Sequence, residues 1–582
     1  MTIVLWIGQW HDVAMHIDGV PNRTSRPTYL LRESYREGKK VRKRTLANLS
    51  ALSDEQIESI RAVLAGQDLR PVDQLWETTC SLPHGSVQAV RVAMQRLGFE
   101  ALIAARASPE RDVVCAMVAA RILSPNTKLA TTRWWGKTTL AEEFAVTETD
   151  ENDLYAAMDW LLERQGTIEK KLAARHLTEG GQALYDLSSS YFEGRCCPLA
   201  KIGYSRDGRR NTLQVNYGLL TTRVGCPVAI SVYEGNTGDA KTLLPQVQQL
   251  REEFGLERLV LVGDRGMISH KAIGTLRSLE GLDWITALKS VQIRALVQGG
   301  TLQLGLFDER NLFEFSHPDF PGERLMACRN VDLGKLRAHK REALLVATEK
   351  ELEKIRVRVE NGALAGKDTI GVRAGKVVNK YKVGKHFTLS IEDAHFAYQR
   401  RAEQIAAEAA LDGLYVIRTS VTQKQMDSAE AVRSYKALAE VERAFRSMKT
   451  IDLRIRPIHH RLENRVRAHI FLCMLSYYVE WHMREAWREL LFADEDLTRK
   501  TKRDPVAAAE RSEAALQKIT VRTLSDGSPV HSFRTLLHDL STIVRNTCRA
   551  RTDKVPASTF QMTTTPNTTQ QRALTLLQSI RV

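Results

Sequence analysis

Three acidic residues, far apart along the chain, stand where the sequence predicts rigid elements. Asp186 lies in the segment ALYDLSSSYFEG, Asp264 ends the apolar run RLVLVGD, and Glu442 lies in a long helical segment at 428–450. Carboxylates are the ligands that Mg²⁺ and Mn²⁺ prefer, and two such ions about 4 Å apart can stabilise the attacking and leaving oxygens of a phosphodiester. These residue types indicate metal-dependent phosphodiester chemistry, with two Mg²⁺ or Mn²⁺ ions per site.

The elements around these residues follow a defined order. Apolar patterning predicts a strand around Asp186, two more strands at 213–222 and 226–235, then a helix, a strand at 258–264, a second helix and a strand at 282–289. This is the order of the ribonuclease-H-like fold, in which the first and fourth strands lie side by side. Asp186 and Asp264 would then converge, and the helix at 428–450 would supply Glu442 as the third carboxylate.

Each acidic residue taken alone has a structural alternative. The chain contains 69 Asp and Glu residues, and some of them will end strands by chance. A glutamate on a helix is more often a solvated or salt-bridged surface residue than a metal ligand. The functional interpretation therefore depends on all three residues occupying the places that the fold order predicts.

The remaining segments predict a multidomain α/β protein. Residues 1–84 are expected to form a basic β module, because LRESYREGKKVRKRTLANLS alternates apolar and polar residues around a turn and ends in a cationic strand. A solvated basic hairpin and a DNA-contacting ribbon both fit this pattern. Residues 85–178 show apolar positions at helical spacing and are expected to form a helical, DNA-binding domain.

The predicted core is discontinuous and comprises residues 179–289 and 431–490. Residues 290–430 between them contain alternating apolar pieces such as TLQLGLF, HFTLSI and LYVIRTS, which predict a β-rich insertion subdomain with helical excursions. Residues 491–582 are expected to form a helical, basic C-terminal region. That region is expected to be partly loose, because its segment TFQMTTTPNTTQQ is polar.

The ordered combination of these pieces resembles the DDE insertion-sequence transposases. The resemblance is to the large bacterial group with a Tyr-x2-Arg-x3-Glu-x6-Lys signature and a β-rich insertion before the catalytic glutamate. The signature residues here are Tyr435, Glu442 and Lys449, with Leu438 at the arginine position. VYEGNTGDAKTL, LVGDRGM, DGLYVIRTS and RPIHHRLENRVRAHIFLCMLSYYVE carry the rest of the match, which runs from about residue 20 to about residue 490.

This resemblance implies both a site and a substrate. It implies Asp186, Asp264 and Glu442 as catalytic metal ligands. It further implies that the protein binds double-stranded DNA at terminal inverted repeats, acts as a homodimer on that DNA, cuts strands and joins them to target DNA.

Basic residues near the glutamate are the expected DNA contacts. Tyr435, Glu442 and Lys449 are seven residues apart, so a regular helix would present them on one face. The candidates for DNA binding are one tyrosine and the cations on and after this helix: Tyr435, Arg443, Arg446, Lys449, Arg454, Arg456, Arg461 and Arg465. Leu438 cannot bind phosphate, and Arg443 or Arg446 could compensate for it. A second group of cations lies between the first two predicted strands of the core: Arg195, Lys201, Arg206, Arg209 and Arg210.

Composition agrees with a nucleic-acid partner without establishing one. Lys and Arg number 84 against 69 Asp and Glu, which gives a net charge of +15 and a pI of about 9.4. The eight cysteines show no Cys-x-x-Cys pair and no Cys/His quartet at zinc spacing, so reduced thiols in a cytoplasmic, nucleoid-associated bacterial protein are expected. We expect no membrane span, because the most apolar stretch, IFLCMLSYYVEW, is too short and contains Glu480.

Two alternatives to a transposase remain open from the residues. One is a catalytically retired protein that only binds DNA, for which Leu438 is the single hint. The other is a host nuclease on the same fold that cuts strands without joining them. Enzymes that use ATP or NAD are excluded, because no phosphate-loop or dinucleotide-binding motif occurs.

Overall fold

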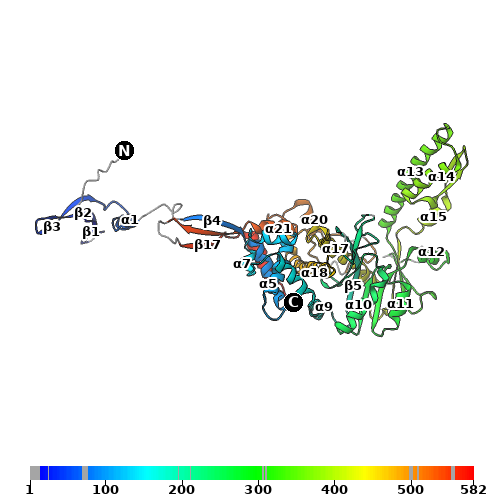
Figure 1. The fold of residues 1–582 in the computed structure, drawn as a ribbon, viewed down its shortest axis with the longest axis horizontal. Helices are drawn as coiled ribbons and strands as arrows, with labels where there is room; N and C mark the ends of the chain where they lie inside the picture. The colour runs from blue at the N-terminus through cyan, green and yellow to red at the C-terminus, as the bar shows by residue number, and fades with distance from the viewer. Residues whose placement is uncertain are drawn as a thin grey trace. The chain divides into compact units, whose positions relative to one another are not determined.

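A computed structural model describes most of the chain. The described residues are 14–23, 25–67, 76–194, 196–209, 211–303, 307, 311–496, 502–507, 510–551 and 558–582. They fall into two compact units, one made of residues 1–81 with 545–563 and the other of residues 82–544 with 564–582. Figure 1 shows the fold with the element labels used below.

The described residues of the first unit form two small antiparallel sheets and the helix α1. Strands β1 (Ala14–Val20), β2 (Thr28–Glu37) and β3 (Lys40–Asn48) form one sheet, and β4 (Trp76–Pro83), β16 (Val544–Ala550) and β17 (Thr559–Thr563) form the other. Helix α1 (Asp54–Leu64) begins with a capping box at Ser53. The turn between β2 and β3 passes through Gly38, whose φ of +64° favours glycine.

The cations of β3 are paired rather than isolated. Its Arg42, Lys43 and Arg44 form ion pairs with acidic residues of β1 and β2, namely Glu37, Asp18 and Glu33. All of β3 is exposed. The basic ribbon therefore carries a mixture of both charges on its surface.

A nine-stranded mixed sheet forms the centre of the second unit. Its first five long strands are β5 (Gln182–Tyr191), β7 (Leu213–Thr222), β8 (Pro227–Glu234), β9 (Leu259–Gly263) and β10 (Leu282–Ala287). They lie in the order β8-β7-β5-β9-β10, with β5, β9 and β10 parallel and β7 antiparallel to both of its neighbours. Helix α10 (Leu243–Gln248) precedes β9, and α11 (His270–Arg277) connects β9 to β10. The predicted alternation of strands and helices is present, and the first and fourth of these strands are neighbours.

Residues 85–178 are helical, as the periodicity predicts. The helices of this segment are α3 (Gly85–Arg96), α4 (Phe99–Ile103), α5 (Pro109–Leu123), α6 (Lys128–Trp135), α7 (Leu140–Glu143), α8 (Glu151–Leu162) and α9 (Gln165–His176). Ten consecutive residues of α5 are buried, and α5 packs against α3, α8 and α18 (Glu463–Ala486). The helices and the sheet share one hydrophobic core.

The prediction that residues 290–430 are rich in β-structure is wrong. Two helices dominate the segment, the 30-residue α13 (Val331–Glu360) and the 15-residue α14 (Lys367–Tyr381), which lie side by side in Figure 1 and pack on a core of their own with the hairpin β13 (Phe387–Ile391) and β14 (Phe396–Arg400). Strands β11 (Leu312–Phe315), β12 (Arg324–Arg329) and β15 (Leu414–Thr419) instead extend the central sheet beyond β10. Apolar alternation predicts the strand β15 in LYVIRTS but does not predict β12, and it does not reveal which sheet these strands join.

The C-terminal end, which was predicted to be partly loose, forms regular elements in its described residues. The polar segment at 559–571 contains β17, which pairs with β16, and the start of α22 (Thr568–Leu577), which Asn567 caps. Backbone hydrogen bonds and the cap stabilise these elements even though few of their side chains are apolar. Helices α20 (Glu513–Val521) and α21 (Phe533–Ser541) precede them.

The segment predicted as one helix at 428–450 is divided. It consists of α16 (Ser428–Lys436), α17 (Leu438–Arg446) and a π-helical turn, Ser447–Ile451, before α18. A π turn advances the side chains by a different angle from an α turn, so residues on its two sides do not keep the seven-residue register. Tyr435, Glu442 and Lys449 therefore do not lie on one regular helix face.

Candidate active site

Asp186 and Asp264 lie next to each other on adjacent parallel strands. The last paired residues of β5 and β9 are Tyr185 and Gly263, and each aspartate is the next residue along its strand. The backbone N–H of Leu187 donates to Asp186 Oδ1 at 2.8 Å, and the N–H of Arg265 donates to Asp264 Oδ1 at 2.7 Å. Each carboxylate is thus oriented by the residue that follows it.

Glu442 reaches the same place from α17. The buried face of that helix, Val441, Ala444 and Phe445, packs against β5, and the Phe445 ring lies 5.8 Å from the ring of Tyr217 on β7. Glu442 is on the exposed face, and its charge acts on Asp186. Figure 1 shows α17 beside β5. Glu442 therefore influences the charge of Asp186, but the carboxylate oxygens of the three acidic residues do not all lie within 4.8 Å of one another.

A buried polar network fixes the end of α17. The Ser447 hydroxyl lies 2.7 Å from Glu480 Oε1 and 2.9 Å from Asp452 Oδ2, and Arg484 bonds both of those carboxylates. Glu480 belongs to α18, the most buried long helix of the second unit. The helix that carries Glu442 is consequently tied to the core at both its apolar face and its C-terminal end.

The electrostatics of Asp186 show that negative charge is crowded here. The pKa of Asp186 is raised from its ordinary 3.8 to about 7. Burial is the main cause and the charges of Asp264 and Glu442 add to it, while the Leu187 N–H and Arg206 act in the opposite direction. A divalent cation would relieve this crowding, since it favours the ionised carboxylates. Three carboxylates on rigid elements form a donor set that fits a hard, oxygen-preferring cation.

Tyr435 of the signature lies beside the two aspartates. Burial raises the pKa of the Tyr435 phenol, and the nearby Asp264 and Asp186 raise it as well. Leu438, at the signature arginine position, is partly buried and packs against the hydrophobic core. Leu438 therefore serves packing between α17 and the core.

Two further charged residues border the site: Asp239, which the sequence did not predict there, and Arg206, one of the cations noted between the first two predicted strands. Asp239 starts a 3₁₀ turn and forms an ion pair with Arg206. A Cβ atom placed on Gly266 would lie 3.5 Å from Oδ2 of both Asp239 and Asp264, so these two carboxylates face the same small space. Neither residue has a spacing signal in the sequence, because Arg206 lies in the loop before β7 and Asp239 in the loop after β8.

A basic pocket lies at the carboxyl end of β5. It has a volume of about 300 Å³ and is lined by Tyr191, Asp207, Arg209, Lys449, Thr450, Arg454 and Arg456, which we call the β5-end pocket. Three of the predicted DNA contacts, Lys449, Arg454 and Arg456, gather here. Four cations and one carboxylate line the pocket, so its net charge is positive.

The buried side chain of Asp207 holds two of the pocket's cations in place. Its side chain is 1% exposed and pairs with Arg456 and with Lys449, whose Nζ lies 3.1 Å from Asp207 Oδ1. The N–H of Tyr191 donates to the other oxygen at 3.0 Å. The Arg209 guanidinium lies 3.7 Å from the centre of the Tyr191 ring. Asp207 was not predicted, because no local feature distinguishes it from other acidic residues in turns.

The other predicted DNA contacts are dispersed. Arg443 is exposed and pairs with Glu440, while Arg446 and Arg461 are exposed. Arg465 instead covers the ring of Tyr155 on α8 at 4.4 Å and thus serves packing within the second unit. Of the cations predicted between the first two strands, Arg195 and Arg210 lie outside the described residues.

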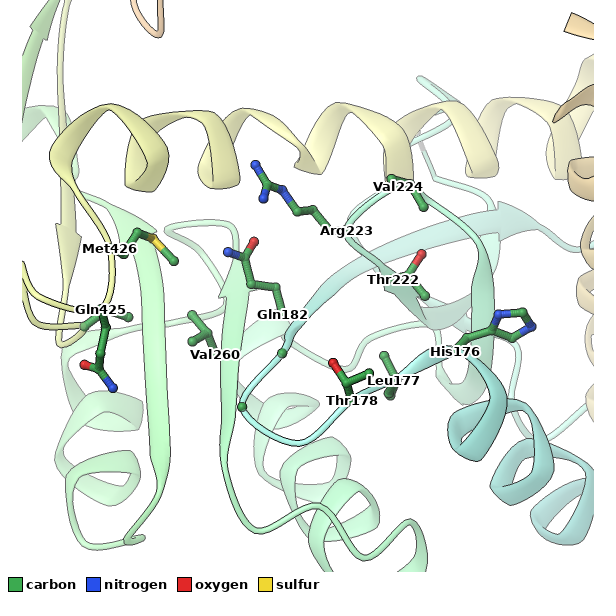
Figure 2. A pocket seen from close by; sticks show the side chains of 13 residues that line it. His176, Leu177, Thr178, Gln182, Thr222, Arg223, Val224, Val260, Gln425 and Met426 are labelled. Carbon is green, nitrogen blue, oxygen red and sulfur yellow. The ribbon is translucent and has the colours of Figure 1, made fainter. Parts of the chain in front are cut away.

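The larger pocket of the second unit is elsewhere. It has a volume of about 600 Å³ and lies where β5 begins, at the opposite end of that strand from the β5-end pocket; Figure 2 shows its lining, which includes His176, Gln182, Thr222 and Met426. The three acidic residues line neither pocket. An open acidic surface beside a basic pocket is suited to a long polymer rather than to a small molecule. Among the described residues, no helix is both long enough and apolar enough to cross a membrane.

Comparison with known proteins gives two family matches. Residues 198–479 match the transposase DDE domain, and residues 19–77 match the N-terminal domain of IS1634 family transposases; together the matches span more than half of the chain. No curated protein matches. Among solved structures, the chain is similar to piggyBac transposase in a synaptic complex with hairpin DNA, with a TM-score of 0.35, 8% identity, and coverage of 78% of this chain and 75% of that chain.

Proposed function

The chain belongs to the insertion-sequence DDE transposases, and we propose that it uses Asp186, Asp264 and Glu442 to hold two Mg²⁺ or Mn²⁺ ions while it cuts DNA and joins the ends to a target. The observation that carries the proposal is the adjacency of Asp186 and Asp264 after the last paired residues of β5 and β9, with Glu442 acting on Asp186 from α17. The strand order β8-β7-β5-β9-β10 supports a ribonuclease-H-like core.

The residues of the chain would act mainly by holding charges in place. Bound divalent ions would supply activation of the attacking oxygen and stabilisation of the leaving oxygen. Asp186 and Asp264 are oriented by backbone N–H groups, so their carboxylates need little rearrangement to bind cations. The Tyr435 phenol, whose pKa is raised, remains protonated at neutral pH and can donate a hydrogen bond to a phosphate oxygen beside the aspartates.

The β5-end pocket is suited to hold the DNA strand beyond the cut. Five residues of β5 separate Asp186 from Tyr191, which corresponds to about 17 Å along a strand, or a few nucleotides of DNA. Lys449 and Arg456 are aligned by buried Asp207, and Arg209 and Arg454 complete the cationic wall. We therefore propose Lys449, Arg454 and Arg456 as the main DNA contacts, ahead of the dispersed cations. We no longer propose Arg465 as a DNA contact.

The partners and domain roles follow from the same proposal. The DNA would be the terminal inverted repeats of the element and its target, and the active species would be a homodimer on DNA in the bacterial cytoplasm, associated with the nucleoid. The helical residues 85–178 and the basic module at 1–84 would recognise the repeats, the core at 179–289 and 431–490 would perform the chemistry, and the segments 290–430 and 491–582 would support it.

The decisive experiment measures cleavage and strand transfer on DNA that carries the ends of the element. With Mg²⁺, the wild-type protein should cut and join, and Asp186→Asn, Asp264→Asn and Glu442→Gln should each abolish both reactions while DNA binding persists. Glu440→Gln is the matched control, because it makes the same chemical change two residues away on α17, where Glu440 pairs with Arg443. Full activity in any of the three acidic variants would refute the assignment, and cutting without joining would favour a nuclease.

A further inference from the structure

Three metal-binding residue types meet in the second unit, away from the acidic residues. His176 ends α9, Cys226 precedes β8, and His482 lies near the end of α18. Their ligand atoms all lie within 4.8 Å of one another, and Cys226 Sγ is 3.9 Å from His482 Nε2. Among the described residues, this is the one group of three such side chains close enough to share an ion.

The geometry is close to that of a tetrahedral zinc site. With Zn–S near 2.3 Å and Zn–N near 2.1 Å, a tetrahedral angle places sulfur and nitrogen about 3.6 Å apart. The observed separation of 3.9 Å between Cys226 and His482 needs only a small inward movement of side chains. A thiolate with two imidazoles suits zinc, whereas the carboxylates at Asp186 and Asp264 suit magnesium.

The protonation states suit metal binding as well. Burial lowers the pKa of His176 to about 4 and of His482 to about 3, so both imidazoles are neutral at pH 7 and can each offer a lone pair. Burial raises the pKa of the Cys226 thiol and the charge of Glu485 raises it as well, so the thiolate needs a compensating positive charge. A bound divalent ion would supply that charge and displace the thiol proton.

The three candidate ligands are largely buried, and a pocket connects one of them to solvent. Cys226 and His482 are 1% and 7% exposed, whereas His176 is partly exposed and lines the pocket of about 600 Å³ at the start of β5, as Figure 2 shows. The Tyr478 hydroxyl lies 3.0 Å from His176 Nε2. A fourth ligand can therefore come from a water in the pocket or from the Tyr478 oxygen.

We propose that His176, Cys226 and His482 bind a structural Zn²⁺ ion that ties α9 and α18 to the start of β8. The three ligands come from the helical segment, the central sheet and the long core helix, so one ion would join the parts of the second unit. A hydrogen-bonded cluster of rings is the alternative, since the His482 ring also contacts Tyr478 and Trp481 at 4.8 Å. The proposal is independent of the catalytic assignment.

The test is made in full-length protein carrying Asp186→Asn, so that binding at the acidic site does not interfere. Elemental analysis of the purified protein should give about one zinc per chain, and Cys226→Ser or His482→Gln should weaken zinc affinity by about 100-fold or more. Cys473→Ser is the matched control, because Cys473 is also a buried cysteine and lies on α18, outside the cluster. It should retain the zinc.

A second readout separates loss of metal from loss of fold. Co²⁺ added to the zinc-free protein should give visible absorption bands with a sulfur-to-cobalt charge-transfer band, and the charge-transfer band should be absent in Cys226→Ser. Zn²⁺ should raise the melting temperature of the parent but not that of Cys226→Ser. Zinc content equal in the parent and Cys226→Ser, or a parent that binds neither Zn²⁺ nor Co²⁺, would overturn the proposal.

Discussion

Replacement of Asp186 by asparagine should abolish catalysis and yet stabilise the metal-free fold. The side chain of asparagine has nearly the same shape and can still accept the Leu187 N–H through Oδ1. Asparagine carries no charge, so the variant avoids both the desolvation cost of burying a carboxylate and the repulsion from Asp264 and Glu442. A residue placed for function at the expense of stability behaves in this way.

The magnitude follows from the raised pKa of Asp186. An increase from 3.8 in the unfolded chain to about 7 in the folded protein corresponds to at most about 4 kcal/mol. Because the folded pKa is the higher one, protonated Asp186 is tolerated at low pH, and stability is lost as the pH rises from about 4 through about 7. The advantage of the variant should therefore be about 1.7 kcal/mol at pH 5 and reach its full value of about 4 kcal/mol near pH 8.

The assay is thermal unfolding of the wild type and Asp186→Asn at pH 5 and pH 8. The buffer should be free of Mg²⁺ but contain no chelator, so that the proposed zinc is retained. We expect the variant to melt a few degrees higher at pH 8, given about 2–4 °C per kcal/mol for domains of 150–250 residues and less for longer ones. Added Mg²⁺ should raise the melting temperature of the wild type and narrow the difference. A variant that is less stable than the wild type at pH 8, or a difference independent of pH, would refute the reasoning.

Three further substitutions test the elements around the site. Lys449→Ala should weaken DNA binding and reduce the salt dependence, measured as the slope of log affinity against log salt, by about 1; an unchanged slope would remove Lys449 from the DNA path. Gly218→Ala should destabilise the protein by about 2 kcal/mol or more in denaturant unfolding, because the new Cβ atom would lie 2.1 Å from the Tyr185 hydroxyl. Gly274→Ala is the control: Gly274 lies on the exposed face of α11, where a Cβ atom meets open space, so this variant should be neutral or mildly stabilising. Ser447→Ala removes a hydroxyl buried between two carboxylates and should cost about 1–3 kcal/mol, with lower cleavage because α17 is less firmly held; an unchanged unfolding midpoint would contradict that role.

Local pattern alone determined much of the sheet. Apolar alternation and short apolar runs predict β5, β7, β8, β9 and β10, because the pattern of apolar residues along a strand reflects which of its side chains are buried. The adjacency of Asp186 and Asp264 then followed from the order of the strands and helices, since parallel neighbours bring their ends to one edge. Glu442 was predicted as the third acidic residue from the spacing of the signature residues, which can be recognised in a single sequence.

Only the tertiary structure decided which distant residues meet. Periodicity records that a side chain is buried but not against what, so it could not place β11, β12 and β15 in the central sheet or foresee the core of α13 and α14. The same limit hid Asp207 beneath Lys449 and Arg456. It also hid His176, Cys226 and His482, because zinc spacing is a local signal and these three residues come from separate segments that only packing of the second unit draws together.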